Sequence, residues 1–368
     1  MLEIRQGKVI EILSHRDGLT EIRIDINGKE KKGICYDYLS GRVEVGDEVV
    51  VNTTATSLAL GTGGYDFVIN ILGKDSELEA QGHIMKMRYT PYQIQTFSVE
   101  EQDSPYHERI NNFHSLIETP VIAGTLHSML VPITVMIKKK TPQARITYVM
   151  TDGAALPIQF SNIVHYLKKE EIIDNTITIG HSFGGDLEAV NIYSALIAAY
   201  EIQEADIIIV SMGPGIVGTG TKYGFTGVEQ ADILHATKVL GGRPIAVPRI
   251  SFSDKRERHY GLSHHSRTNL GELALIRAKV GIPYLTQEKN SVLEQQLSDS
   301  EIINKHDIIY RKGKEVLEVL SELDFEVTTM GRRVEEEQEY FMAAGIAGII
   351  ASEELRKEDD NGSKGEDS

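Results

Sequence analysis

Short runs of alternating apolar and polar residues fill the first 75 residues of the chain. The runs are VIEIL, TEIRIDI, VEVGDEVVVN and DFVINIL, and turn signals such as Asn27-Gly28 and Gly46-Asp47 separate them. Alternation with a period of two indicates half-buried strands, and Asn-Gly is typical of a tight hairpin turn. We therefore expect residues 1–75 to form a small β-module, either an SH3-like or an OB-like barrel.

From Pro120 onward, apolar runs that suit strands alternate with stretches of helical periodicity, which is typical of βαβ units. Runs such as IIIV (207–210) are apolar at every position and indicate burial on both faces of a sheet. We predict a doubly wound, mostly parallel α/β sheet domain over residues 120–355. Its expected strands are 121–126, 144–150, 175–180, 205–211, 243–252 and 325–330, and its expected helices are 128–140, 157–170, 186–202, 228–240, 270–280, 313–323 and 334–355.

Two further segments lie outside these predicted domains. Residues 76–119 are expected to connect them through a strand at 83–90 and a polar loop. Residues 356–368 are polar and charged with little to bury, so we expect a disordered acidic tail.

Composition narrows the possible classes of protein. The chain is 41% hydrophobic and 25% charged, which is ordinary for a globular fold. Its formal net charge of −16 disfavours binding to nucleic acid or to an anionic membrane surface. The beginning of the chain has no signal-peptide pattern, and no run approaches the roughly 20 apolar residues of a membrane span. With Cys35 as its single cysteine the chain forms no internal disulfide, and we expect a cytoplasmic location.

Polar and ionisable residues follow nearly every predicted strand. Ligands of open parallel sheets bind at the carboxyl ends of the strands, so we predict one polar site at that edge. The candidate catalytic residues are His127, Asp152, His181, Ser182, Asp186, Asp254, His264 and His265.

Gly180-His181-Ser182-Phe183-Gly184 matches the nucleophile elbow of α/β-hydrolases, in which Ser182 would attack an acyl carbon. Asp254 followed by His264 or His265 would complete the triad. The short spacing between Asp254 and His264, and the absence of an upstream HGGG-type loop, argue against this interpretation. The alternative is a glycine-bounded turn that allows close helix packing.

Oxygen ligands near the same junction are a weak indication of a metal site. Asp152, Asp186 and Glu188 could offer carboxylates to Mg²⁺ or Mn²⁺, although a solvated helix start is the favoured explanation.

Two segments are candidates for binding an anion. Gly213, Gly215 and Gly218 form a G-x-G-x-x-G pattern after a predicted strand, but no helix start follows them, so we expect an anion-binding loop instead of a dinucleotide site. The segment 249–267 carries a local charge of 5 − 2 = +3. Its candidate ligands for phosphate or carboxylate are Arg249, Arg256 and Arg267, unless these arginines pair with acidic neighbours or a second subunit. We expect the adjacent His264 and His265 to point apart and not to share one metal.

Several stretches together resemble an uncharacterised bacterial family, domain of unknown function 3866. They are NTTATSLALGTGGYDFV (52–68), YVMTDGAALP (148–157), GHSFGGDLEAVN (180–191), SMGPGIVGTGTKYGFTG (211–227) and SHHSRTN (263–269). The resemblance spans nearly the whole chain to about residue 350. It implies a bacterial setting and carries no activity.

The leading hypothesis is an enzyme that acts on a small anionic metabolite at the strand ends. The alternatives are a non-catalytic ligand-binding sensor or protein-interaction module, and a serine esterase that uses the Ser182 elbow. A homo-oligomer is compatible with the small-residue helix at 340–351.

Overall fold

The computed structural model describes residues 2–61, 63–75 and 81–362, with side chains through Arg356. The chain divides into two compact units, Met1–Phe97 and Ser98–Ser368. Each unit is described by itself below.

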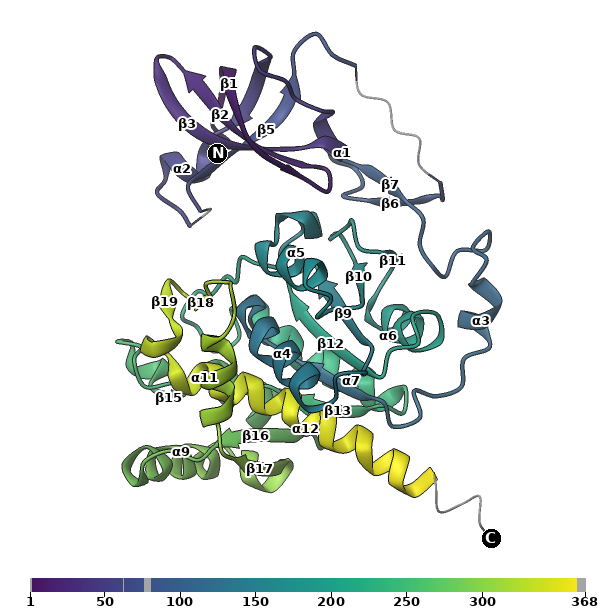
Figure 1. Cartoon of the computed structure of the whole chain (residues 1–368), viewed down its shortest axis with the longest axis vertical. Helices are drawn as coiled ribbons and strands as arrows, with labels where there is room; N and C mark the ends of the chain where they lie inside the picture. The colour runs from purple at the N-terminus through teal and green to yellow at the C-terminus, as the bar shows by residue number, and fades with distance from the viewer. Residues whose placement is uncertain (1, 62, 76–80, 363–368) are drawn as a thin grey trace. The chain divides into compact units, whose positions relative to one another are not determined.

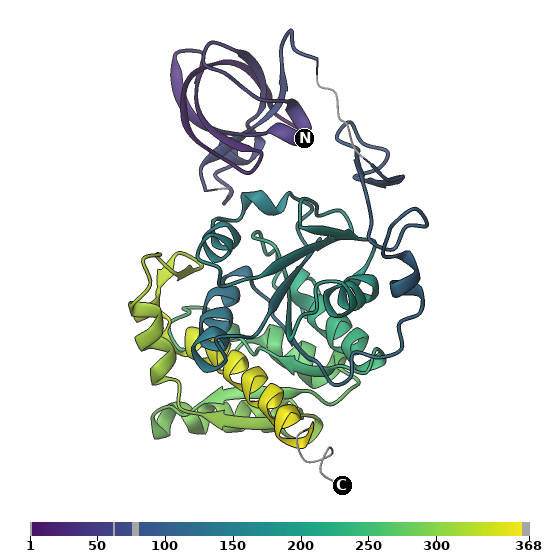
Figure 2. The ribbon, with the colours of Figure 1, turned by 45° about the vertical axis from the view of Figure 1, so that its right-hand side comes forward.

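The first unit is a closed five-stranded barrel, which Figure 2 shows end-on. Its strands close in the order β1-β2-β3-β5-β4, with β1 antiparallel to both β2 and β4 and β3 parallel to β5. A Greek-key barrel of this kind is OB-like, which decides between the two expected barrel types. The strands are β1 (Ile4–Arg16), β2 (Leu19–Ile26), β3 (Lys29–Tyr36), β4 (Glu48–Asn52) and β5 (Tyr65–Ile71), and the short helices are α1 (Asp37–Ser40) and α2 (Thr54–Ser57).

The expected connector, 76–119, is shared between the two units. Its residues up to Phe97 belong to the first unit and include a short hairpin of β6 (Ile84–Lys86) and β7 (Ile94–Thr96). The strand expected at 83–90 is therefore limited to three residues. The rest of the segment belongs to the second unit and contains α3 (His107–Asn111).

The second unit is built on an eight-stranded sheet in which every neighbouring pair of strands runs parallel. In order across the sheet, the strands are β11 (Leu187–Ala189), β10 (Asn175–Ile179), β9 (Ile146–Thr151), β12 (Ile207–Met212), β8 (Pro120–Ala123), β13 (Arg243–Ala246), β16 (Lys279–Pro283) and β17 (Asp307–Arg311).

Helices cover both faces of this sheet, as predicted. Successive residues of β12 enter different cores: Ile207 and Ile209 pack on one face, and Ile208 and Val210 on the other. The first face carries α4 (Leu130–Lys140), α5 (Asn162–Lys169), α11 (Lys314–Ser321) and α12 (Gln338–Gly362), of which α4 and α12 lie in front of the strands in Figure 1. The second face carries α6 (Ile192–Glu201), α7 (Gln230–Val239), α9 (Gln287–Asp299) and α10 (Ile302–Lys305).

Connections leave the four central strands toward opposite faces. The segments after β8 and β9 lead to α4 and α5, whereas those after β12 and β13 lead to the opposite face. In the sheet these strands alternate as β9-β12-β8-β13. Neighbouring loops therefore diverge at the carboxyl edge, which is the arrangement that opens a ligand-binding crevice in doubly wound sheets.

Four predicted elements differ from the structure. Residues 325–330 are not a strand of the large sheet; only β18 (Thr328–Thr329) forms, paired with β19 (Arg332–Arg333). The run 243–252 divides into β13 and β14 (Ile250–Ser251), because Pro248 lacks the N–H that a continuous ladder requires. The helix expected at 186–202 begins only at Ile192, after the edge strand β11. The helix expected at 270–280 is instead a π-helix, Arg267–Leu273, followed by β16.

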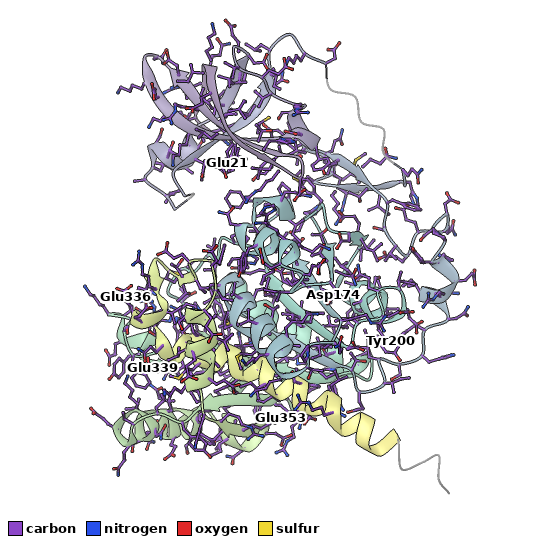
Figure 3. All side chains as sticks on the ribbon, viewed as in Figure 1. Glu21, Asp174, Tyr200, Glu336, Glu339 and Glu353 are labelled. Atoms are coloured by element: carbon purple, nitrogen blue, oxygen red, sulfur yellow. The ribbon has the colours of Figure 1, made fainter. Side chains whose placement is uncertain are left out.

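The helix α12 crosses the sheet and continues beyond it. Glu353, labelled in Figure 3, forms an ion pair of 2.7 Å with Arg311 at the end of β17. The helix runs to Gly362 and so includes the first residues of the tail that we expect to be disordered, where Lys and Glu favour helix. Residues 363–368 of the expected tail lie outside the described residues. Within the described part of the chain, no helix combines the length and apolarity needed to cross a bilayer.

Close packing of α12 on α4 depends on Gly348. A Cβ atom at this position would lie 2.4 Å from the carbonyl oxygen of Ile133. We expect Gly348→Ala to force the helices apart and to lower the free energy of unfolding by about 1–3 kcal/mol. Gly218→Ala is the matched control, because its nearest contact would be an ordinary 3.7 Å. Guanidinium unfolding followed by circular dichroism measures both; equal stabilities would contradict the packing argument.

Candidate metal centre

A single buried amide joins the carboxyl ends of two neighbouring strands. Nε2 of Gln230, the first residue of α7, donates to the carbonyl oxygens of Ala123 (2.8 Å) and Val247 (3.0 Å), at the ends of β8 and β13. Its Oε1 accepts from Nδ2 of Asn269 in the π-helix. The buried Gln230 and Asn269 thereby join the segment that follows β12 to the segment that follows β13.

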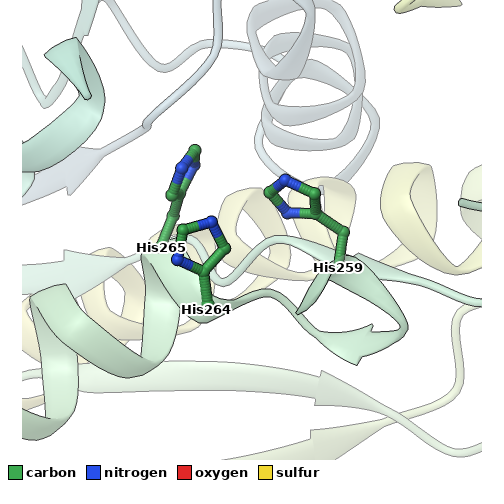
Figure 4. Close-up of side chains that lie close together, drawn as sticks. All are labelled: His259, His264 and His265. Atoms are coloured by element: carbon green, nitrogen blue, oxygen red, sulfur yellow. The ribbon is translucent and has the colours of Figure 1, made fainter. Parts of the chain in front are cut away.

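Three histidines converge in the segment that follows β13. His259 ends a short 3-10 turn, and His264 and His265 begin α8 (His264–Ser266) after the hairpin of β14 and β15 (Gly261–Leu262). One nitrogen of each ring lies within 4.8 Å of the other two, and Figure 4 shows the three rings gathered together. The expectation that His264 and His265 point apart is therefore wrong, because a nitrogen of each lies close to the other. The hairpin also brings His259 next to both.

Neighbouring groups orient these rings. Nδ1 of His259 is hydrogen-bonded to the hydroxyl of Ser263 at 2.7 Å, which leaves its Nε2 for an outside ligand. Phe225 stacks face to face on His265, with ring centroids 3.8 Å apart. Nε2 of His264 is buried and has no hydrogen-bond partner within the described residues. A fixed ring orientation and unpartnered nitrogens are what a metal-binding histidine set requires.

The protonation state of the three rings also suits a metal. Burial, followed by the charges of nearby groups, lowers the pKa of His259 and of His265 to about 3. Burial and four nearby arginines lower the pKa of His264 as well. All three rings are therefore neutral at pH 7, and the neutral imidazole is the form that binds a metal.

Nitrogen ligands indicate a transition metal. Three imidazoles suit zinc, iron, nickel or copper, whereas Mg²⁺ and Mn²⁺, which we expected from the carboxylates, prefer oxygen. Ligand atoms of a tetrahedral zinc site lie about 3.4 Å apart, given Zn–N bonds of about 2.1 Å. One nitrogen of each histidine ring lies within 4.8 Å of the other two, so small rotations of the rings would bring the three nitrogens to this spacing. A fourth ligand position would remain open.

Four arginines surround the three histidines. Arg249, which is 5% exposed, donates to Asp254, and Arg256 makes a bidentate pair with the same carboxylate. Asp254, expected to be catalytic, is thus held in an ion-pair network, and its pKa is lowered chiefly by its hydrogen bond from Arg256. Two of the three arginines predicted to bind an anion are already paired. Arg258 and Arg267 form no ion pair with any carboxylate in the described part of the chain.

The predicted glycine loop passes over the same cluster. A Cβ atom at Gly218 would lie 3.9 Å from Nε2 of His265, and one at Gly220 would lie 3.9 Å from the Arg258 guanidinium. As expected, no helix follows Gly218; the chain forms a hairpin that returns through Phe225 before α7 begins. Gly213 is buried at the end of β12, while Gly215 and Gly218 are exposed.

The other predicted histidines lie elsewhere. His127 is 8% exposed, and its ring is hydrogen-bonded to the Tyr148 hydroxyl (3.2 Å) and the Ser161 hydroxyl (2.6 Å). These bonds tie the end of β8 to the first turn of α5, and burial lowers the pKa of His127 to about 4. The backbone N–H of His181 donates to Asp152.

The residues of the elbow do not form one. The loop 180–186 joins two parallel strands, β10 and β11, where an elbow would join a strand to a helix. Ser182 is fully buried, and its hydroxyl donates to the carbonyl oxygens of Thr151 (3.0 Å) and Ala154 (3.2 Å). A nucleophile must face the substrate, so this geometry supports the alternative of a packed turn.

The three predicted carboxylate ligands are spread along β10. Asp152 accepts from the N–H of His181 beyond the end of that strand. Asp186 accepts from Lys168 and from Thr176, near the start of the strand, and Glu188 accepts from the Thr178 hydroxyl. Each carboxylate thus has its own partners at a different level of the sheet, and the structure does not bring the three together.

Sequence reasoning missed two candidate residues. His259 stood in the basic segment without any feature that distinguished it. Glu229, at the end of a 3-10 turn after the hairpin, accepts a hydrogen bond of 2.7 Å from the Thr151 hydroxyl. Burial, and less strongly the charges of Asp152 and Asp232, raises the pKa of Glu229 to about 7 despite this bond. No spacing of residues in the sequence identifies a carboxyl group whose pKa is raised by burial.

We expect Ser182→Ala to remove the hydroxyl donor that the carbonyl oxygens of Thr151 and Ala154 share, and to lower the free energy of unfolding by roughly 1–2 kcal/mol. A fluorophosphonate probe for nucleophilic serines should leave Ser182 unlabelled in the native protein, because the hydroxyl is buried. Ser291→Ala, at an exposed position of α9, is the matched control for stability. Labelling of Ser182 by the probe would restore the esterase hypothesis.

The raised pKa of Glu229 makes stability depend on pH. The native state binds more protons than the unfolded chain between the ordinary pKa of 4.5 and the native value of about 7, so the carboxyl destabilises the fold increasingly across that window. Glu229→Gln keeps an acceptor for Thr151 and should be roughly 1–3 kcal/mol more stable than the native protein above this window, with no difference below it. Guanidinium unfolding at several pH values measures this, with the exposed Glu318→Gln as control. A constant difference at every pH would contradict the assignment.

Comparisons with known proteins agree with the resemblance noted in the sequence. No curated protein matches the chain. The model of one family, described as "Protein of unknown function (DUF3866)", matches residues 32–348, which include the end of β3, β4 and β5 of the barrel and the whole parallel sheet. The chain therefore belongs to the DUF3866 family.

Proposed function

We propose that this protein is an enzyme that acts on a small anionic metabolite at a single metal ion held by His259, His264 and His265. The observation that carries the proposal is the convergence of three neutral imidazoles, one nitrogen of each within 4.8 Å of the others. A metal with three histidine ligands keeps a fourth position for water or substrate and activates that water, which supports hydrolysis or hydration.

The surroundings of the three histidines support this function. They follow β13, one of the strands whose connections diverge at the carboxyl edge, where ligands of such sheets bind. Arg258 and Arg267 supply positive charge for an anion. Glu229 at the same edge has a pKa of about 7, which suits a residue that transfers protons at neutral pH. The single cysteine is consistent with a cytoplasmic location.

Metal binding by the full chain tests the centre. After treatment with a chelator, the protein is titrated with Co²⁺, whose visible spectrum reports nitrogen coordination, and Zn²⁺ content is measured per chain. We expect one ion per chain, and a loss of affinity of about 100-fold or more in His264→Ala, which removes one of three ligands. His264 is partly exposed, so this variant should keep its fold.

The matched control is His114→Ala, which removes an exposed histidine outside the cluster and should bind Co²⁺ as the native protein does. Equal Co²⁺ affinity of the native and His264→Ala proteins would overturn the metal centre. The metal-loaded protein is then screened for thermal stabilisation by anionic metabolites, since a ligand at 100 times its dissociation constant adds about 2.7 kcal/mol. Stabilisation without turnover would identify a sensor.

A further inference from the structure

The charges around the three histidines do not balance. Arg249 and Arg256 share the carboxylate of Asp254, and the nearby Arg332 pairs with the buried Glu337 at 2.5 Å. Arg258 and Arg267 have no such partner in the described part of the chain, although both act electrostatically on His264. A divalent metal ion would add two positive charges to those of Arg258 and Arg267. A site with this much positive charge requires an anion that carries more than one negative charge.

The glycine loop offers donors at the same place. Gly218 and Gly220 are exposed, and a Cβ atom would lie 3.9 Å from Nε2 of His265 at the first position and 3.9 Å from the Arg258 guanidinium at the second. The N–H groups of these two glycines donate to no acceptor among the described residues, because the hairpin bonds are made by their neighbours Val217 and Thr219. Backbone N–H groups beside a guanidinium are a common way to bind phosphate oxygens.

A hollow beside His264 offers space for the remainder of a ligand. A hollow of about 430 Å³ has His264 and Arg267 in its wall, together with Lys222, which is paired with Glu272 at 2.6 Å. Nε of Arg267 is buried there without a hydrogen-bond partner among the described residues. Asp299 and Glu301 complete the wall, so hydroxyl or amino groups of a ligand would find acceptors.

We infer that the anionic group bound at this centre is a phosphoryl dianion, which Arg258, Arg267 and the N–H groups of Gly218 and Gly220 hold beside the metal. The inference rests on the proposed metal centre and names its class of substrate. A phosphoryl group brings two negative charges and three acceptor oxygens, whereas a monocarboxylate brings one charge and two oxygens. Only the former offsets both unpaired arginines and still leaves an oxygen for the metal.

Mutual dependence of the two ligands follows from the same charges. The metal alone enters a site that already carries uncompensated arginines, and phosphate alone meets arginines without the metal. Each ligand therefore lowers the electrostatic cost of binding the other. Thermodynamic linkage requires that phosphate strengthen metal binding by the same factor by which the metal strengthens phosphate binding.

The experiment measures Zn²⁺ affinity of the full chain by chelator competition, with and without saturating inorganic phosphate, and phosphate affinity by calorimetry with and without Zn²⁺. We expect a coupling of about tenfold or more in each direction. Arg258→Gln should bring the coupling close to one; Arg258 is exposed, so its replacement should leave the fold intact. Arg277→Gln is the matched control. This exposed arginine lies just before β16, at the amino ends of the strands, where it pairs with Asp307.

Failure of the inference is distinguishable from failure of the metal centre. If Zn²⁺ binds neither with nor without phosphate, the metal centre and the inference are both overturned. If Zn²⁺ binds but phosphate leaves its affinity unchanged, or if acetate produces the same coupling as phosphate, the centre stands and the phosphoryl assignment is overturned. Full coupling in Arg258→Gln would likewise overturn the assignment.

Discussion

Burial of β12 on both faces is the constraint on which the second unit depends. Its residues alternate between two cores, so helices must cover both sides of the sheet. Short right-handed connections can meet this requirement only if some strands lead to one face and their neighbours to the other. The divergence of the connections at the carboxyl edge is therefore a by-product of covering the strand, and the candidate site lies on one of these connections, the segment after β13.

Much of this architecture could be predicted because it follows from local patterns of apolar and polar residues in the sequence. The near-continuous apolar run of β12 indicates a strand with two buried faces, and the alternating runs near the beginning of the chain indicate a barrel. Strands β16 and β17 were missed, since Gly281 and Pro283 interrupt the first and the second is a partly exposed edge strand. The edge strand β11 was mistaken for a helix start because it has only three residues and follows a glycine-rich turn.

The candidate site was predictable only in part. Ligands of parallel sheets bind at the carboxyl ends of the strands, and this rule predicted a site at the segment after β13 and the glycine loop after β12. The structure brings these two segments together. The convergence of His259 with His264 and His265 depends on the β14–β15 hairpin, whose strands have two residues each and leave no periodic signal. The carboxylates after β10 looked equally promising, but the parallel return of β11 distributes Asp186 and Glu188 along the strand.

The amide of Gln230 joins the ends of β8 and β13 through two hydrogen bonds from one nitrogen. These strands are neighbours in the sheet, and the N–H of Val247 donates to the same oxygen of Ala123. Because Gln230 is the first residue of α7, its side chain fastens the start of this helix to the carboxyl edge of the sheet. This edge is therefore held in one arrangement before any ligand arrives, so the loss of conformational entropy that orders it belongs to folding and not to binding.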